Sequence, residues 1–142
     1  MLHFSKYQGA GNDFLVVDMR EAKAPLSPEA VIGLCDRHKG VGADGILSLW
    51  PHALADGEMR IQNADGSNAG MCGNGMRCML QFLFDLGVVP AERAGVTLAV
   101  GAQVYECARL ENGQFAVEMG KAETEHALLP EEAICGELLR FQ

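Results

Sequence analysis

The densest run of chemically unusual residues lies between Asn63 and Arg77. It contains Asn-Ala-Asp-Gly-Ser (63–67) and then Met-Cys-Gly-Asn-Gly-Met-Arg (71–77). Cys72 stands directly before a stretch that we predict to be a helix. Unpaired backbone amides and the positive end of the helix macrodipole favour a thiolate there, so this thiol should ionise more readily than that of a free cysteine. The pattern indicates a nucleophile or a base beside a site for an anion such as a carboxylate.

The glycines that follow this cysteine also suit a ligand site. Gly73 and Gly75 let the backbone approach a ligand closely and adopt angles that other residues resist. A lone cysteine is more often a small buried hydrophobe, and glycines often only shape a turn. At Cys72 the helix start, the glycines and the preceding turn together favour the chemical interpretation.

The other four cysteines are predicted to be structural. Cys35 and Cys78 lie on helices among apolar neighbours, Cys107 alternates within a strand, and Cys135 lies near the C-terminus. The spacing of Cys72 and Cys78 does not suit zinc, and there is no His-x-x-x-His pair, so we expect no metal. The four histidines are scattered, which gives little support to a Cys–His hydrolase.

The composition argues against several classes of protein. The 142 residues suffice for one domain, and 49% of them are hydrophobic, so the chain should bury a core. A net charge of −8 argues against binding to nucleic acid or to an anionic membrane surface. No stretch reaches the roughly 20 apolar residues of a membrane span, and no secretory signal is visible. Five cysteines, an odd number, suggest reduced thiols and a cytoplasmic protein.

Apolar periodicity and turn signals outline the elements that must position these residues. Two strands, at 2–7 and 14–19, are joined by a glycine-rich turn. Ser27-Pro28-Glu29 is typical of a helix start, and that helix should include His38 and stop at Gly40. Asn112-Gly113 readily supplies the positive φ angles of a tight hairpin turn. We expect the remaining strands, the last two forming this hairpin, at 46–50, 59–63, 96–100, 104–110 and 114–119.

A second helix runs from about Asn74 to Leu86 and ends at Gly87. Apolar residues cover nearly its whole circumference, so it must be buried, and it is too short to span a membrane. These elements predict an α+β fold in which mixed or antiparallel strands wrap around one central buried helix.

Three blocks, in their order along the chain, resemble signatures of the diaminopimelate epimerases. The first is Phe-Ser-Lys-Tyr-Gln-Gly-Ala-Gly-Asn-Asp-Phe (4–14), and the second is Arg-His-Lys-Gly-Val-Gly-Ala-Asp-Gly (37–45). The third, at 60–67 and 71–78, is similar to the family's active-site block. The rest of the chain fits the family's hairpin layout without diagnostic residues.

The resemblance implies a fold and a reaction. Members of the family interconvert LL- and meso-diaminopimelate, a step toward lysine and bacterial cell-wall precursors, without a cofactor. Two pseudo-symmetric halves hold the substrate between two cysteines. One cysteine removes the α-proton as a thiolate, and the other donates a proton to the opposite face. Fixed amide dipoles in a site closed to water would stabilise the carbanion-like transition state.

Matched to the family's motifs, Cys72 is the thiol of this half. Asn12 and Asn63 match asparagines that bind the substrate, and Gly73 and Asn74 match backbone donors to its carboxylate. The expected partner is therefore the small amino acid diaminopimelate.

The chain departs from the family in two ways. Some members have glutamine where this chain has Gly45, so a side-chain contact there is lost or replaced by water. Family members are also about twice as long. We expect 1–120 to be an N-terminal domain and 121–142 a tail leading into a missing second domain with the second cysteine. Such a fragment should be inactive alone, and its exposed cleft and open strand edge should favour self-association as a homodimer.

Two other interpretations stay open. The chain could come from another cofactor-independent racemase or isomerase of the same fold, such as a proline or hydroxyproline racemase or a phenazine-type isomerase, although the active-site block favours the epimerases. It could instead be a non-catalytic binding or assembly domain that has kept the pocket. Exchange of the α-proton of diaminopimelate in deuterated water separates the three.

Overall fold

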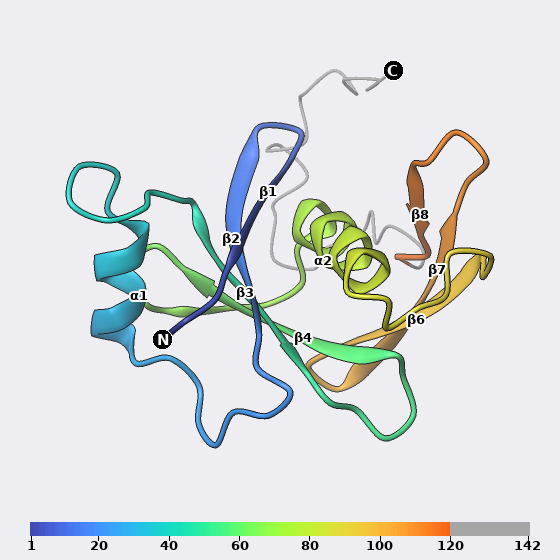
Figure 1. Cartoon of the computed structure of the whole chain (residues 1–142), viewed down its shortest axis with the longest axis horizontal. Helices are drawn as coiled ribbons and strands as arrows, with labels where there is room; N and C mark the ends of the chain where they lie inside the picture. Colours follow the sequence, from blue (N-terminus) through green and yellow to red (C-terminus); the bar gives the residue numbers. More distant parts are fainter. Residues whose placement is uncertain (120–142) are drawn as a thin grey trace, which may run out of the picture.

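The computed structural model describes residues 1–119 of the chain (Figure 1). The expected tail at 121–142 lies outside these described residues. In the described part the elements follow one another as β1 (Ser5–Gly9), β2 (Asn12–Asp18), α1 (Pro28–Cys35), β3 (Gly45–Trp50), β4 (Gly57–Asn63), β5 (Asn68–Ala69), α2 (Gly73–Asp85), β6 (Gly95–Val100), β7 (Gln103–Arg109) and β8 (Phe115–Val117). Neither described helix is long and apolar enough to cross a membrane.

The described strands belong to one mixed sheet that curls into a half-barrel. Its order is β1-β2-β3-β4-β6-β7-β8, and the short β5 pairs with β4 beside this path. The pairs β2–β3 and β4–β6 are parallel, and the others are antiparallel. The curl brings the two edge strands, β1 and β8, into contact with α2 from different sides (Figure 1). The predicted mixture of parallel and antiparallel strands is confirmed.

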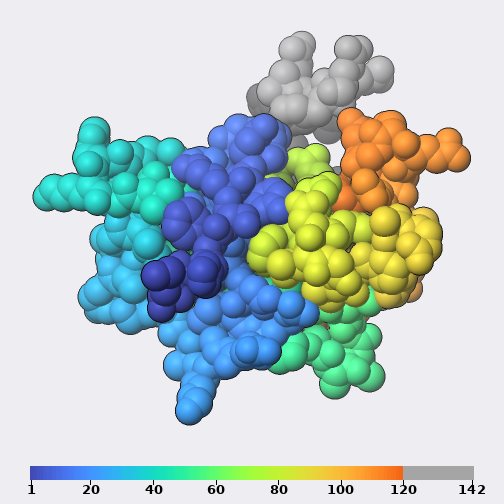
Figure 2. All heavy atoms as spheres, in the orientation of Figure 1, coloured from blue at the N-terminus to red at the C-terminus, as the bar shows by residue number. Residues whose placement is uncertain are grey.

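The helix α2 packs one side against the inner face of this sheet. Met79 and Leu83 are among its buried residues, whereas Arg77 and Asp85 are exposed and Gln81 is half-buried. Residues 77, 81 and 85 recur at the four-residue spacing of one helix face, so the helix carries a polar side. In Figure 2 the yellow-green atoms of α2 and the segment after it are visible between the blue of β1 and the orange of β8. The helix is therefore buried on one side and not all round.

Two buried clusters cover the two faces of the central strands. The larger cluster joins α2 to the sheet and includes Leu47. The smaller one lies under α1 and includes Val31, Ile46 and Trp50. Alternate residues of β3 enter the two clusters, so the whole strand is buried. Covering on both faces explains its nearly unbroken apolar sequence.

The first helix is shorter than its sequence predicts. Its start is as expected, with Ser27 as N-cap and Pro28 in the first turn. It ends at Cys35, because the Asp36 carboxylate accepts hydrogen bonds from the next backbone N–H groups, including that of His38 at 2.7 Å. An aspartate that binds its own neighbouring amides offers the backbone an alternative to the helix. His38 therefore lies in a turn.

Several details of the strands differ from the sequence prediction, and the first strand begins at Ser5 instead of residue 2. The strand Asn68–Ala69 has two residues, which is too short to show an alternating pattern. The hairpin between β7 and β8 is present, but Gly113 alone takes the positive φ angle, of 80°. Asn112 contributes in another way, since its side chain accepts a hydrogen bond from the Gln114 N–H at 3.0 Å.

Shortening Leu83 tests the contribution of α2 to stability. This side chain is fully buried between helix and sheet, so Leu83→Ala should lower the free energy of unfolding by about 2–5 kcal/mol. Leu54→Ala is the control, because Leu54 is 85% exposed, and it should change this free energy by less than ~0.5 kcal/mol. Urea unfolding followed by circular dichroism measures both variants. Equal effects would contradict the packing of α2 on the sheet.

Candidate active site

Cys72 is the N-cap of α2. Its backbone is extended, with φ −137° and ψ 110°, and its Sγ accepts a hydrogen bond from the Gly75 N–H at 3.4 Å. The half-buried thiol thus takes one of the amides that a helix start leaves unpaired. A Cβ at Gly75 would lie 3.2 Å from Leu47 Cδ2 and 3.6 Å from the Cys72 sulfur, so glycine keeps this turn closely packed. The thiol lies at the positive end of the helix, where negative charge is favoured.

Two of the asparagines expected at the site touch each other. Asn12, at the start of β2, accepts a hydrogen bond through Oδ1 from Asn74 Nδ2 at 2.8 Å. Asn74 is the second residue of α2, and its own Oδ1 accepts from the Arg77 guanidinium. The contact joins residues 62 positions apart in the sequence into one polar surface next to the N-cap.

A cluster of charged residues supports Asn12 from the other side. Asp44 Oδ2 accepts hydrogen bonds from Asn12 Nδ2 at 3.2 Å and from the Asp13 N–H at 3.1 Å. The Arg37 guanidinium bridges Asp13 and Asp44, at 2.6 and 2.8 Å, and Lys6 pairs with Asp13 at 2.9 Å. Hydrogen bonds from Arg37 and then Lys6 hold the pKa of Asp13 well below its usual range. The cluster fastens the β1–β2 turn to the loop before β3.

Asn63 is held in a tight turn at the end of β4. Its N–H donates to the Ser67 carbonyl at 2.8 Å, and its Nδ2 donates to Ser67 Oγ at 3.0 Å. It pairs with Gly45 across the sheet, and the Ala64 N–H donates to the Asp44 carbonyl at 3.1 Å. The turn therefore lies against the loop that supports Asn12, although the Asn63 amide bonds to its own turn.

The two glycines of interest, Gly45 and Gly73, have opposite surroundings. An added Cβ at Gly45 would lie 2.6 Å from the backbone carbonyl oxygen of Gln62, so the backbone of β4 fills the space of any side chain there. At Gly73 the nearest atom to an added Cβ is Met119 Sδ, at 3.5 Å. The Met119 side chain thus lies beside the Cα of the first residue of α2, a placement that the sequence does not signal.

Sequence reasoning found the asparagines but missed their charged partners. Asp13 and Asp44 lie in glycine-rich turns, where such residues are common for conformational reasons alone. A signal was present, because each of the first two sequence blocks contains a cation and an acid: Lys6 with Asp13, and Arg37 with Asp44. Opposite charges within two glycine-rich turns suit ion pairing between those turns.

The remaining described cysteines are buried, and burial raises the pKa of each thiol. The pKa is raised at Cys35 and Cys78, and it reaches about 11 at Cys107. Cys135 lies outside the described residues. Within residues 1–119 no group of three or more His, Cys, Asp or Glu side chains is placed to bind a metal ion.

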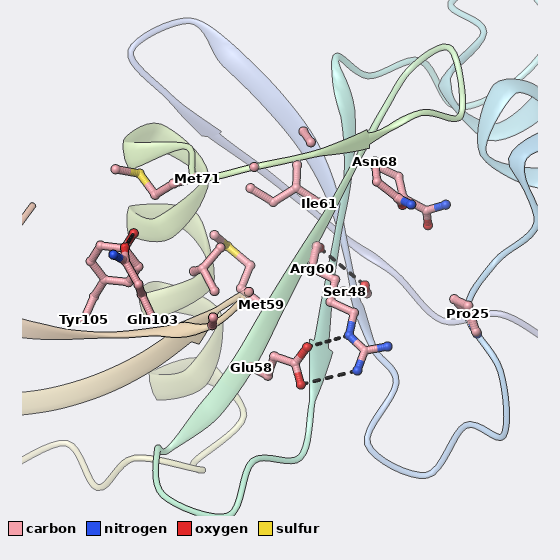
Figure 3. A pocket seen from close by; sticks show the side chains of 16 residues that line it. Pro25, Ser48, Glu58, Met59, Arg60, Ile61, Asn68, Met71, Gln103 and Tyr105 are labelled. Atoms are coloured by element: carbon pink, nitrogen blue, oxygen red, sulfur yellow. Dashed lines mark hydrogen bonds and ion pairs between the residues drawn. The ribbon is translucent and has the colours of Figure 1, made fainter.

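A cavity of about 730 Å³ lies beside β4 and the β6–β7 turn (Figure 3). Its wall includes Glu58 and Arg60, which pair at 2.6 Å, and the Arg60 guanidinium lies 4.5 Å from the centre of the Trp50 ring. Met71 also lines it, but Cys72 and the other residues matched to the family's site do not. The polar surface around the N-cap is therefore separate from this cavity.

Comparison with known proteins relates these features to a family. The sequence model of the family described as diaminopimelate epimerase matches residues 4–125. The chain is 42% identical over 145 residues to a protein named diaminopimelate epimerase from Pelotomaculum thermopropionicum, a match covering 97% of this chain and 51% of that protein. The chain spans about half the length of the curated relatives that it matches.

Solved structures show the same fold under other names. Methylitaconate-delta-isomerase is similar with a TM-score of 0.62 at 16% identity, over 81% of this chain and 62% of that chain. A probable proline racemase from Agrobacterium radiobacter has a TM-score of 0.56 at 17% identity, over 80% of this chain and 39% of that chain. At these identities the likeness concerns the fold alone.

Cys72 should be the first described cysteine to react with iodoacetamide near neutral pH. It is half-buried at a helix start, whereas Cys35, Cys78 and Cys107 are buried with raised pKa values, and the thiolate is the reactive form. Peptide mapping after partial alkylation gives the order of labelling. In denatured protein, the control, the differences should vanish. Earlier labelling of Cys35 or Cys107 in the native chain would refute the prediction.

Proposed function

The chain belongs to the diaminopimelate epimerase family, and from this premise we propose that it forms one half of an active site that inverts an α-carbon of diaminopimelate. The observation that carries the proposal is the thiol of Cys72 at the N-cap of α2, next to the Asn12–Asn74 pair. The reaction interconverts the LL and meso forms, toward lysine and cell-wall precursors.

In this proposal Cys72 exchanges a proton with the substrate α-carbon. As a thiolate it removes the α-proton, and a second thiol from the other half of the enzyme donates a proton to the opposite face. In the reverse direction the two thiols exchange roles. The electron pair left by the proton delocalises into the substrate carboxylate. Fixed amide dipoles and the exclusion of water stabilise this charge, so we expect no cofactor.

The start of α2 suits that carboxylate. The Gly75 N–H donates to the Cys72 sulfur, and the Met76 N–H donates to the Cys72 carbonyl at 2.8 Å. The backbone amides of Gly73 and Asn74 precede this first intrahelical hydrogen bond and have no partner within the helix. We assign these two amides to the substrate carboxylate.

The side chains of Asn12 and Asn63 are assigned to the amino-acid end of the substrate. Asn12 is half-buried and Asn63 is exposed, and both border the loop at Asp44. An asparagine amide has two N–H donors, and Asn63 uses one of them on Ser67. Its second N–H can therefore bind a substrate without opening the turn.

We also propose the domain arrangement in which this half works. Residues 1–120 form an N-terminal domain whose strands would surround α2 as a central helix once the half-barrel is closed, and 121–142 leads toward a second domain with the second thiol. The relatives' length supports this, and so does a groove of about 640 Å³ over the polar side of α2, lined from β1, α2 and β8. A further strand in that groove would close the half-barrel.

The thiol chemistry favours a cytoplasmic location. A cysteine that exchanges protons must stay reduced, and cytosolic reductants keep thiols in that state. The four described cysteines are all free.

The isolated chain should not epimerise diaminopimelate at a useful rate. With one thiol, a proton can leave the α-carbon but cannot be returned to the opposite face. Fusion to the second half of a full-length relative, here called the completed enzyme, should restore the reaction.

In the completed enzyme Asn63→Ala should lower kcat/KM roughly ten- to a hundredfold, through loss of one hydrogen bond to a charged group.

Inversion at the α-carbon, followed together with deuterium uptake in deuterated water, measures all of these, with proline as the control substrate. Turnover by the isolated chain, or an unchanged kcat/KM in Asn63→Ala, would count against the assignment. In the completed enzyme, turnover of proline instead of diaminopimelate would indicate another racemase of this fold, and turnover of neither would indicate a non-catalytic domain.

The isolated chain should self-associate as a dimer. Among the described strands, β1 and β8 lie at the edges of the sheet, and the backbone groups of edge strands favour pairing with another chain. Because the family's halves are pseudo-symmetric, a twofold dimer would imitate the missing half. Light scattering over a concentration series gives the mass, and the completed enzyme is the comparison. A strictly monomeric chain at high concentration would contradict this prediction.

A further inference from the structure

The neighbours of Asn12 decide which way its side-chain amide faces. The two orientations of an asparagine amide have nearly the same shape, so only hydrogen-bond partners distinguish them. Asn12 Oδ1 lies 2.8 Å from Asn74 Nδ2, and Asn12 Nδ2 lies 3.2 Å from Asp44 Oδ2. Asn74 could present a donor or an acceptor, whereas a carboxylate only accepts. Asp44 therefore fixes Nδ2 of Asn12 toward itself and Oδ1 toward Asn74.

The other end of this row of residues is fixed in the same way. The Arg77 guanidinium only donates, and it bonds to Asn74 Oδ1, which leaves Asn74 Nδ2 to face Asn12. Arg77, which only donates, and Asp44, which only accepts, thus stand at the two ends of the Asn74 and Asn12 side-chain amides. We call these four residues the amide row. Each of its hydrogen bonds is donated in the same direction, from Arg77 toward Asp44. Each of the two amides keeps one N–H that the row does not use, and N–H donors suit a carboxylate.

Asp44 is itself held in place. Its Oδ1 accepts a hydrogen bond from Arg37 at 2.8 Å, and its Oδ2 accepts from the Asp13 N–H at 3.1 Å. Arg37 also donates to both carboxylate oxygens of Asp13, at 2.6 and 3.1 Å. Turning the Asp44 carboxylate away from Asn12 would break these bonds, and charge-assisted hydrogen bonds are among the strong ones.

We propose that Asp44, held by Arg37, is a positioning residue that sets the direction of the amide row and so presents N–H donors to a substrate carboxylate. Asp44 acts through Asn12 and does not itself touch the substrate. The inference rests on the proposed function for its substrate, and on the geometry of the row for its direction.

Asp44→Asn tests the direction of the row at nearly constant size. An amide cannot accept on both sides, so either Arg37 or Asn12 must then face an NH₂ group, and Asn12 is free to turn. In the ¹⁵N-labelled 142-residue chain the side-chain amide signals of Asn12 and Asn74 should shift. Asp18→Asn is the matched control. It removes the same charge from an acid paired with an arginine at 2.7 Å outside the row, with 34% side-chain exposure against 39% for Asp44, and both signals should stay in place.

The kinetic readout separates positioning from a general loss of structure. In the completed enzyme Asp44→Asn should lower kcat/KM for diaminopimelate roughly ten- to a hundredfold, mainly through KM. The alkylation rate of Cys72 should match that of the wild type, and Asp18→Asn should have wild-type kinetics. A merely structural defect would instead increase labelling of the buried cysteines. Should Asp44→Asn fail to fold, Arg77→Gln at the exposed end of the row tests the same direction, and the Asn74 signal should shift.

Unchanged amide signals in Asp44→Asn would overturn the inference whatever the activity. Shifted signals with an unchanged kcat/KM would overturn it too, because the row would then be a structural contact. If the completed wild-type enzyme does not act on diaminopimelate, the proposed function fails. The amide signals still decide whether Asp44 sets the direction of the row.

Discussion

The unpaired backbone amides at the start of α2 are the feature on which the candidate site depends. Every helix has such amides, but here they begin directly after a cysteine, whose sulfur takes one of them. Their position is fixed because the buried side of the helix, with Met79 and Leu83, is packed against the curled sheet. The thiol and the backbone amides that the helix leaves unpaired are thereby held together by the packing of one helix.

The charged cluster beside the helix start contributes orientation more than stability. Its ion pairs lie at the surface, where Arg37 is 54% and Asp44 39% exposed, and such pairs typically contribute about 0–1 kcal/mol. Their geometric effect is larger. Arg37 joins two turns that are far apart in the sequence. Asp44 and Arg77 restrict the side-chain amides of Asn12 and Asn74, which lie between them, to one orientation. The proposed proton transfer at carbon would need the reacting groups in a narrow geometry, and a network of this kind restricts geometry.

The features that the sequence predicts well are local ones. The start of α1, the hairpin before Gln114 and the position of Cys72 before a helix each follow from a few neighbouring residues. The features that it misses depend on contacts between distant segments. In the sequence Asp44 resembles an ordinary turn residue, and only the fold places its carboxylate against Asn12. Likewise, glycine is required at position 45 because the Gln62 carbonyl of the neighbouring strand fills the space of a side chain. The early end of α1 is an intermediate case, since Asp36 is local but its competing hydrogen bonds leave no periodic signal.

Proton exchange by Cys72 at the substrate α-carbon is the central claim, and one measurement tests it most directly. Deuterium uptake and epimerisation of diaminopimelate are followed in deuterated water for the completed enzyme and for its Cys72→Ala variant. We predict a loss of at least about a hundredfold in the variant, the typical contribution of a positioned acid or base. Epimerisation at the wild-type rate without this thiol would contradict the claim.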